Sequence, residues 1–500
     1  MSVIRRKIDN FSITVLKFLG SNTFLYVIIG LFVVQALWFA FSLAYPLAYD
    51  ESYHFGIIKA YTGQLGPIIF DQPESLDYLR DLENETSFIY HYLMSFPLRF
   101  IMLFTESNAV QVISLRIINI AFAAGGFFAY AKLFTKIKMP KLYTNIGLFF
   151  FSMIPVLAYL SATINYDNLL MPVTAGYFIA CATYLRGKPW QWQNIASVVA
   201  LGTFASLVKF TFLPLFAVSL GFFAVRAWQY RIGFFRNLGF SIKTTTWRRN
   251  TVISLVLVST IGLFSSIYFK NVVVYGTPLP SCQITLSAER CKANPIIVRG
   301  EMIRQNKEDR KPDLLSGYVM TWIETMFSGQ SQVIVRAPAE SNPKPSSLPI
   351  ITNTLFFGGI ISIAALLYAG RRIQWSVERK FLLVMTITLF AAVFMKTASG
   401  YFTHYLPLAI QPRYLFTVLP ILIVLSVCAF GIILRGQRTL AVACLLVITL
   451  LLTQGGGMTS YLLRSEPDWY WDSQAVRDVN SGLKKITQPF VKEYPDKYGF

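Results

Sequence analysis

Residues 22–47, NTFLYVIIGLFVVQALWFAFSLAYPL, contain no charged side chain. A run of about 20 apolar residues is long enough to cross the hydrocarbon core of a bilayer as a helix. The rest of the chain has the same character, since 54% of its 500 residues are hydrophobic and only 14% are charged. The sequence therefore predicts an integral membrane protein and not a soluble one.

Further apolar runs follow the first one, and polar loops of varying length separate them. This pattern predicts an all-α polytopic membrane protein with about eleven transmembrane helices. Residues 1–455 form one transmembrane domain in this interpretation, and residues 456–500 form a short tail. The expected spans are 22–46, 108–131, 142–163, 168–185, 194–208, 211–229, 251–269, 351–369, 381–397, 414–434 and 439–455.

Basic residues are distributed unevenly among the expected loops. If the N-terminus lies inside, the inner loops hold 22 Lys or Arg but only two acidic residues, Asp9 and Glu378. The net charge of +20 then lies on one face, as the positive-inside rule requires. We therefore expect a multi-pass protein of the inner or plasma membrane, with a cytoplasmic N-terminus. Residues 47–107, 270–350 and 456–500 lie outside in this topology, and the basic composition needs no nucleic-acid partner.

The first outer loop, residues 47–107, holds nine acidic residues and three basic ones, Lys59, Arg80 and Arg99. Its last part, FIYHYLMSFPLRFIMLF, is apolar but is interrupted by polar residues and a proline. If this segment crossed the membrane, every later loop would change sides and the charge asymmetry would be inverted. We therefore expect it to form an interfacial helix on the outer membrane surface.

Cys282 and Cys291 lie nine positions apart in the second outer loop, residues 270–350. An oxidising compartment permits a disulfide there, and this pairing is the prediction. Two free thiols are the alternative.

Ionisable residues at membrane depth are costly and are candidates for function. Here they gather at the expected outer ends of the helices: the pair Asp50 and Glu51 in YDESYHF, Asp167 in NYDNLL, Lys209 in LVKFTFLP and Arg413 in QPRYLFTVLP. This convergence predicts one outer pocket. Its expected members are Asp50, Glu51, His54, His91, Arg116, Asp167, Lys209, Gln411, Arg413 and Tyr414.

Each of these residues also has a purely structural explanation. Lys209 and Arg413 can extend to lipid phosphates, and Asp167 can cap the N-terminus of a helix. His54 can be an interfacial histidine whose hydrogen bonds are satisfied.

Carboxylates and cations at one membrane surface suit the transfer of a sugar from a lipid phosphate. A carboxylate can accept the proton of an attacking hydroxyl group. Lys and Arg can hold a phosphate and offset its charge as it leaves. Asp50, Glu51, His54, His91 and Asp167 are also types that bind divalent metals, but no close ligand spacing requires a metal, and no cofactor is predicted with certainty.

The four motifs quoted above, in this order, resemble those of the GT-C superfamily of membrane glycosyltransferases. The resemblance covers about residues 20–435. It is nearest to glycosyltransferase family 39, the protein mannosyltransferases that use dolichyl-phosphate mannose, and to the lipid A aminoarabinose transferases. Unlike the protein mannosyltransferases, this chain has no sugar-binding module in its outer loops. No large soluble domain follows its last expected helix.

The resemblance implies a GT-C-like transmembrane domain and an active site that faces outside. It implies that Asp50 is the catalytic base, with Glu51 in a supporting role, and that Lys209 and Arg413 face the donor phosphate. The implied partners are a donor sugar on a polyprenyl phosphate, membrane lipids and a hydroxyl-bearing acceptor. That acceptor is a lipid, a glycan or a polymer.

Two other functions stay open. A transporter or flippase for a lipid-linked sugar would use polar groups near the membrane midplane and broken helices. A non-catalytic subunit of an envelope-glycan assembly would keep the helices but would not need Asp50.

Overall fold

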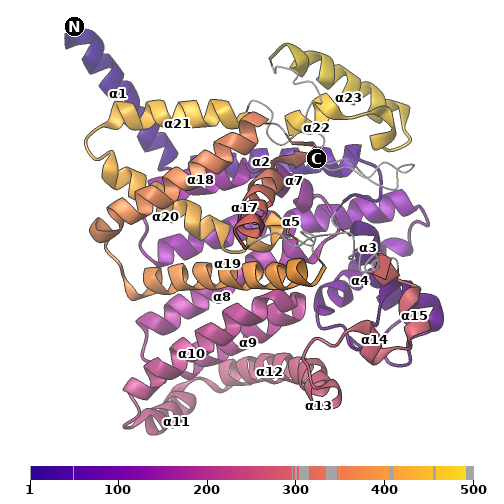
Figure 1. Cartoon of the computed structure of the whole chain (residues 1–500). Helices are drawn as coiled ribbons and strands as arrows, with labels where there is room; N and C mark the ends of the chain where they lie inside the picture. The colour runs from indigo at the N-terminus through magenta and orange to yellow at the C-terminus, as the bar shows by residue number, and fades with distance from the viewer. Residues whose placement is uncertain are drawn as a thin grey trace.

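The computed structural model of the chain describes residues 2–48, 50–294, 297–298, 301–302, 315–333, 346–347, 349–404, 410–453 and 458–490. These residues form a bundle of roughly parallel helices (Figure 1). The exception is a short antiparallel ribbon, in which β1 (Gln332–Val333) pairs with β2 (Ser346–Ser347). The protein is an all-α polytopic membrane protein, as the sequence predicts.

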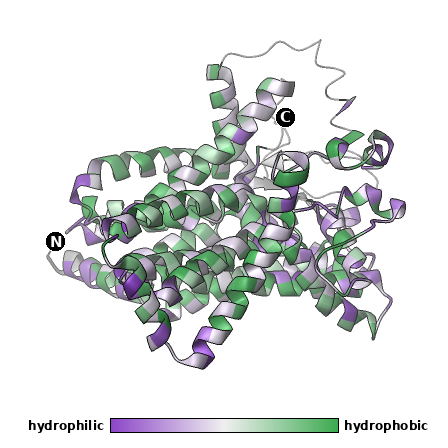
Figure 2. Cartoon of the chain, turned by 90° about the horizontal axis from the view of Figure 1, so that it is seen from below, coloured by the Kyte–Doolittle hydropathy of each residue, from purple (hydrophilic) through white to green (hydrophobic). Residues whose placement is uncertain are grey.

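In the part of the chain that the structure describes, seven stretches of helix are long and apolar enough to cross a membrane. Because lipid offers no hydrogen bonds, the backbone of such a stretch must satisfy its own polar groups, and a helix does so. Hydrophobic residues follow these helices along the middle of the bundle, and hydrophilic residues gather toward its ends (Figure 2). The seven stretches are α2 (Asn22–Ser42), α5 (Asn108–Lys136), α8 (Tyr166–Arg186), η2 (Phe210–Phe212) with α10 (Leu213–Gln229), α12 (Trp247–Phe264) with η3 (Ser265–Phe269) and α13 (Lys270–Tyr275), α18 (Pro349–Ala369), and α19 (Val377–His404).

One bent pair of described helices passes the same test of length and hydropathy only when its two members are taken together. The sequence predicts one straight helix over 142–163, but α6 (Lys141–Ser152) and α7 (Pro155–Ser161) meet at an angle of 76°. Pro155 begins α7 and has no N–H to continue the hydrogen bonds of α6, which explains the break.

Three shorter apolar helices coincide with the remaining predicted spans. They are α9 (Trp192–Val208), α20 (Leu419–Ile433) and α21 (Arg438–Thr453). The predicted total of eleven spans and the orientation of the N-terminus stay predictions. Several predicted bounds differ from the observed ones by a few residues; for example, the run predicted to span from 414 begins with the 3₁₀ turn η5 (Pro412–Leu415), and α20 starts after it.

The first outer loop folds into α3 (Glu51–Thr62), η1 (Glu74–Leu79) and α4 (Ile89–Met102). Its apolar last part is helical, as predicted. In α4, Leu93, Phe96 and Phe100 are exposed along one side, and the helix packs against α3 and α5. An exposed apolar side is consistent with a helix that lies at the membrane interface.

Three parts of the chain meet at the end of the bundle where α3 and α4 lie (Figure 1). The second outer loop brings α14 (Cys282–Thr285) and α15 (Ala288–Lys292) to this end. The tail brings α22 (Met458–Arg464), η6 (Pro467–Trp469), α23 (Gln474–Thr487) and η7 (Gln488–Phe490). The remaining described elements are α1 (Ser2–Leu19), α11 (Phe234–Thr244), α17 (Leu315–Ser331) and η4 (Gly370–Arg372).

The tail is tied to the bundle just beyond the C-terminus of α2. Ala44 donates a backbone hydrogen bond to Trp469 at 2.9 Å, and Trp471 donates one to Ser42 at 3.0 Å. The indole of Trp38 also donates to the side-chain oxygen of Asn480 at 2.8 Å. The predicted short tail therefore covers the end of the bundle beside the first outer loop.

The middle of the bundle is formed by α5 and α8, which pack closely against each other. Within the candidate spans, α8 is the most deeply buried. Its N-terminus, which carries Asp167, is therefore held firmly, and the polar residues around it rest on a packed core.

Candidate functional site

Asp50 lies directly before the first residue of α3. The sequence predicts that the acidic pair ends the first membrane helix, but α2 ends at Ser42 and Asp50 and Glu51 begin the next helix. Asp50 has φ 69° and ψ 26°, a left-handed conformation that Asp adopts more readily than most residues. Its carboxylate is 48% exposed and accepts a hydrogen bond from Arg413 Nη2 at 3.0 Å. Asp50 is therefore both held and accessible.

Glu51 points the other way, into the bundle, and is completely buried with Arg116. Arg116 donates from Nε and Nη2 to the two carboxylate oxygens, at 2.8 and 2.7 Å. Those oxygens also accept the backbone N–H groups of Leu47, at 2.7 Å, and Ile164, at 3.2 Å. Four donors surround the carboxylate, so it has no capacity left for another ligand.

Arg116 is equally occupied. Its Nη1 donates to the backbone carbonyls of Leu43 at 2.6 Å and Ala40 at 3.2 Å, and its guanidinium lies 5.4 Å from the ring of Trp471 in the tail. A substrate-binding role for Arg116 and a catalytic one for Glu51 are predicted from the sequence. Their burial and saturation do not support these roles. The geometry instead favours a structural pair that joins α2, α3, α5 and the loop before α8.

Asp167 and Lys209 form a second buried pair. Lys209 Nζ lies 2.5 Å from Asp167 Oδ1, and the side chains are 1% and 7% exposed. The other oxygen, Oδ2, is buried and accepts no hydrogen bond from a described residue. A buried oxygen without a donor is costly unless a ligand or water satisfies it. This pair, unlike that of Glu51, is incompletely satisfied.

Aromatic rings surround the Lys209 ammonium. Its Nζ lies 4.6 Å from the ring centre of Tyr166 and 4.6 Å from that of Tyr414. Both contacts are favourable because the face of an aromatic ring attracts a cation. Tyr414 is a predicted member of the site, whereas Tyr166 is not, although its position next to Asp167 in NYDNLL was a signal for it.

Arg413 connects this pair to Asp50. It is 4% exposed, and its Nε donates to the side chain of Gln411 at 2.5 Å. Its guanidinium carbon lies 5.5 Å from the ring centre of Tyr414. Gln411 and Tyr414 therefore orient the guanidinium that reaches Asp50, as their predicted place in the site requires.

His54 and His91 lie beneath Tyr166. Their rings stack, and His54 Nδ1 is 2.8 Å from His91 Nε2. Because the Ser87 carbonyl can only accept, His91 Nδ1 carries the proton that bonds to it at 3.1 Å. His91 Nε2 then accepts from His54 Nδ1, so the ring of His91 is neutral.

Burial lowers the pKa of His91 to about 3. Burial also lowers the pKa of His54 well below its usual range, and electrostatic repulsion from His91, Arg413 and Lys209 lowers the pKa of His54 further. Both residues lie in the outer loop, outside the membrane-spanning helices. The rings therefore stay neutral at physiological pH and act as packing and hydrogen-bonding groups rather than as acids.

The structural alternatives can now be compared with the geometry. Lys209 and Arg413 are buried and paired with carboxylates, so neither extends to lipid phosphates. The N-terminal cap of α8 is Asn165, which accepts the N–H of Asp167, and Asp167 itself belongs to the first turn. The interpretation of His54 as a satisfied histidine agrees with its contact to His91.

The predicted residues therefore divide into two neighbouring groups. Together, Asp50, Gln411, Arg413, Tyr414, Lys209, Asp167, His54 and His91, joined by Tyr166, form what we call the acidic–basic site. Glu51 and Arg116 form the adjoining buried pair. In the described part of the chain, no group of three or more His, Cys, Asp or Glu side chains is placed to hold a metal ion.

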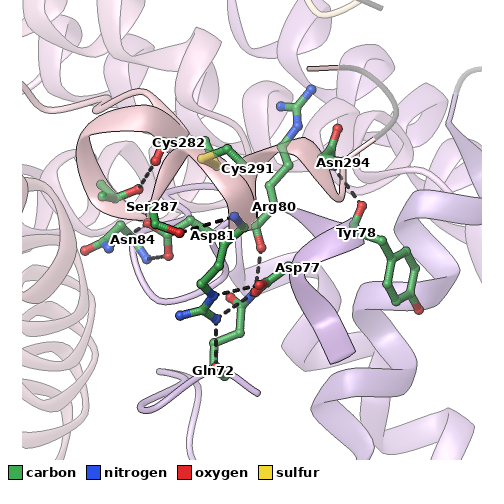
Figure 3. The surroundings of a disulfide bond; sticks show 12 residues. Gln72, Asp77, Tyr78, Arg80, Asp81, Asn84, Cys282, Ser287, Cys291 and Asn294 are labelled. Atoms are coloured by element: carbon green, nitrogen blue, oxygen red, sulfur yellow. Dashed lines mark hydrogen bonds and ion pairs between the residues drawn. A yellow bond between two sulfur atoms is a disulfide. The ribbon is translucent and has the colours of Figure 1, made fainter. Parts of the chain in front are cut away.

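The second outer loop supports the first. Cys282 and Cys291 form the disulfide that the sequence predicts, with their Cα atoms 5.9 Å apart. From the short segment that this bond closes, Arg290 donates to both carboxylate oxygens of Asp77, at 2.6 and 2.7 Å, and to the carbonyl of Gln72 at 3.0 Å (Figure 3). The side chain of Gln72 in turn donates to the carbonyl of Arg80 at 2.8 Å.

Arg80 has an unusual backbone. With φ 71° and ψ −166°, it lies in a region that is almost restricted to glycine. Such a conformation costs about 1–3 kcal/mol and persists only where surrounding contacts impose it. Here the contacts are those of Gln72 and Asp77, because the N–H of Arg80 donates to the Asp77 carbonyl at 3.0 Å.

Comparison with known proteins gives no family. Neither a scan against protein-family models nor a search of curated proteins finds a match for the chain. The function is therefore argued from the acidic–basic site itself.

Proposed function

We propose that the protein is a membrane glycosyltransferase that moves a sugar from a polyprenyl-phosphate donor to a hydroxyl group of an acceptor. The acceptor is a lipid, a glycan or a polymer. Transfer takes place at the end of the bundle where α3 and α4 lie, which the charge pattern of the loops assigns to the extracytoplasmic side.

One observation carries this proposal. Asp50 is the half-exposed carboxylate among charged groups that are otherwise buried, and it lies beside two fixed cations. The acceptor oxygen attacks the anomeric carbon, its proton passes to Asp50, and the bond between that carbon and the phosphate oxygen breaks. A single displacement of this kind inverts the configuration of the sugar.

The cations suit the leaving group. Arg413 and Lys209 are each paired with a carboxylate, so the ligand-free site is close to electrically neutral. A phosphate that approached them would gain charge-assisted hydrogen bonds, and these strengthen as negative charge collects on it during bond cleavage. The apolar helices beside the site supply a surface for the polyprenyl chain.

A transporter or flippase is the second candidate, and the broken span favours it. Helices α6 and α7 meet at 76°, and α7 leads through the segment that carries Ile164 to the first turn of α8, which carries Asp167. Broken helices beside a binding site are typical of transporters. A structure with this feature can bind a lipid-linked sugar without transferring it.

The test is transfer of a labelled sugar from a polyprenyl-phosphate donor by the purified full-length protein. Asp50→Asn keeps the size of the side chain but removes its ability to accept a proton, so we expect a rate loss of about 100-fold or more. Asp472→Asn is the matched control, since Asp472 is 98% exposed and pairs with Arg477 rather than with a residue of the acidic–basic site.

Near-normal transfer by Asp50→Asn would remove the base from this mechanism. If wild-type protein transferred no sugar but moved the lipid-linked sugar across vesicle membranes, the transporter would be the correct function.

A further inference from the structure

Arg80 is a cation whose guanidinium has no hydrogen-bond partner among the described residues. Its Nε is buried and unpaired, and no carboxylate of the described chain lies within ion-pairing distance of it. The other arginines that the structure describes in the two outer loops have hydrogen-bond partners, since Arg99 donates to the carbonyls of Tyr61 and Gln64 and Arg290 to Asp77. An arginine seldom leaves its donors unused at a partly buried position.

The strained backbone of Arg80 fixes the direction in which its side chain leaves the loop. The contacts of Gln72 and Asp77 impose its glycine-like conformation, and the disulfide-closed segment holds both of those residues in place through Arg290. In Figure 3 the side chain of Arg80 runs away from Asp77, and no interaction is drawn to its guanidinium. Strain imposed by several independent contacts is a feature of binding and catalytic sites.

The guanidinium reaches toward the acidic–basic site. It lies 5.6 Å from the ring centre of Tyr53, which belongs to the first turn of α3, three residues after Asp50. The Tyr53 hydroxyl responds to the charges of both Arg80 and Asp50, because the pKa of Tyr53 is raised by burial and by Glu85 and Asp50, while Arg80 lowers it. Arg80 therefore lies against the first turn of α3, which begins directly after Asp50, whereas Arg413 from η5 contacts Asp50 itself.

Glu85 is the charged neighbour of Arg80, but the two are not hydrogen-bonded. The carboxylate of Glu85 accepts the N–H of Ser87 at 2.9 Å rather than a guanidinium donor. Burial raises the pKa of Glu85, while the hydrogen bond from Ser87 and the positive charge of Arg80 lower it. An oriented guanidinium without a hydrogen-bonded anion is suited to a group with two oxygens that can accept its paired donors.

We propose that Arg80 binds an oxyanion, a phosphate or carboxylate, carried by the acceptor. The identification of the ligand as the acceptor rests on the proposed function, but the binding of an oxyanion by Arg80 does not depend on sugar transfer. The arrangement places cations on two sides of Asp50: Arg413 and Lys209 for the donor phosphate, and Arg80 for a charged group on the molecule that is glycosylated. It predicts that the acceptor is anionic.

The experiment measures ligand binding to the full-length protein in detergent, from the shift of its thermal unfolding midpoint. Farnesyl phosphate, a short lipid phosphate, is titrated first and then held at saturation while inorganic phosphate is titrated against a chloride control of equal ionic strength. The variants are Arg80→Gln and Arg80→Gly, with Lys59→Gln as the matched control. Lys59 is an exposed cation of the same loop that bonds to Asn108.

We expect both Arg80 variants to bind inorganic phosphate about 10- to 100-fold more weakly, as the loss of charged hydrogen bonds implies, while farnesyl phosphate binds as before. Lys59→Gln should match the wild type for both ligands. Arg80→Gly separates binding from folding, because glycine adopts the observed backbone freely. Its midpoint without ligand should therefore not fall below that of Arg80→Gln.

Two outcomes would overturn the proposal. If the Arg80 variants lost farnesyl phosphate binding instead, Arg80 would belong to the donor side. If both ligands bound the variants as tightly as they bind the wild type, Arg80 would not be a binding residue for an oxyanion. Neither outcome depends on the effect of Asp50→Asn on transfer, so a failure of the proposed function and a failure of this proposal are distinguishable.

Discussion

Asp50 and Glu51 are neighbours in the chain, yet they belong to two groups of charged residues that differ in exposure and in how fully their hydrogen bonds are satisfied. Glu51 is completely buried, and four donors occupy its carboxylate, two of them from Arg116. Asp50 is 48% exposed and rests against Arg413. The first cluster ties helices together and has no capacity for a ligand. The second keeps an accessible acceptor beside fixed cations, which is what proton transfer and anion binding require.

Asp167 belongs with Asp50 by this criterion. It is almost as buried as Glu51, but one of its oxygens lacks a donor. The number of satisfied hydrogen bonds, more than burial or distance to a cation, therefore separates the saturated carboxylate of Glu51 from the two carboxylates for which we propose a function. The predictions below test this distinction.

The largest expected effect is on stability, when the saturated pair loses one member. Glu51→Ala leaves the Arg116 guanidinium buried without a counter-charge, which costs about 3–5 kcal/mol. Folding stabilities are about 5–15 kcal/mol, so we expect a greatly reduced yield and thermal midpoint in detergent. Replacing both charges, as Glu51→Leu with Arg116→Met, should recover much of the loss, because no buried charge remains unpaired.

The matched comparison is Asp50→Asn, which removes a half-exposed charge. Its cost in stability should be about 1 kcal/mol or less, since partly solvated ion pairs contribute little. Equal losses of stability in Glu51→Ala and Asp50→Asn would show that the two clusters do not differ as the structure indicates.

The second expected effect is a loss of stability in acid, and it concerns His91 in the acidic–basic site. The pKa of His91 is about 3 in the folded protein and 6.5 without these surroundings. As pH falls below about 6.5, the unfolded chain binds a proton that the folded one does not. Stability is therefore complete above pH 6.5 and falls toward pH 3. At pH 5 the loss from His91 is roughly 2 kcal/mol.

Thermal unfolding of wild type and His91→Gln between pH 7 and pH 5 measures this effect. Glutamine has no proton to gain, so the variant should lose less stability than wild type over the same interval. Parallel curves for the two proteins would show that His91 is not held neutral by burial.

The smallest expected effect is a change in donor use. Arg413→Lys keeps the charge but cannot donate to Gln411 and Asp50 at the same time from a planar group. We expect the KM for the donor to rise about 10-fold, which corresponds to the loss of one good charged hydrogen bond. Arg477→Lys, at the exposed pair with Asp472 in the tail, is the control and should leave KM unchanged. An unchanged KM in Arg413→Lys would restrict Arg413 to a structural role.

Much of the fold could be predicted from the sequence, because apolar runs of sufficient length determine membrane helices whatever their neighbours are. The sequence analysis does not predict the break between α6 and α7, although Pro155 lies there. Hydropathy averaged over a window of residues does not show where a helix changes direction. In the first outer loop the sequence predicts only the last helix, α4, as an interfacial helix; α3 and η1 are not predicted, since their packing depends on α4 and on α15 of the second loop.

The composition of the site was also predictable, because charges at helix ends are costly in a membrane protein and are retained for a reason. The division of those charges was not. Nothing in YDESYHF indicates that Glu51 turns inward to Arg116, which lies 65 positions later, while Asp50 stays accessible. Tyr166 and Arg80 are not predicted as members of a site either, because tyrosine and arginine are common residue types.

The sequence by itself determined that this protein is a bundle of membrane helices, and it predicted that most of its acids gather at one end. Solvation decides both features, and solvation depends on residue type and local pattern alone. Only the tertiary structure decided which carboxylate is saturated, which is exposed, and which arginine is left with unused donors. Those properties depend on how many hydrogen-bonding groups from distant parts of the chain meet each side chain, and that number exists only once the chain is folded.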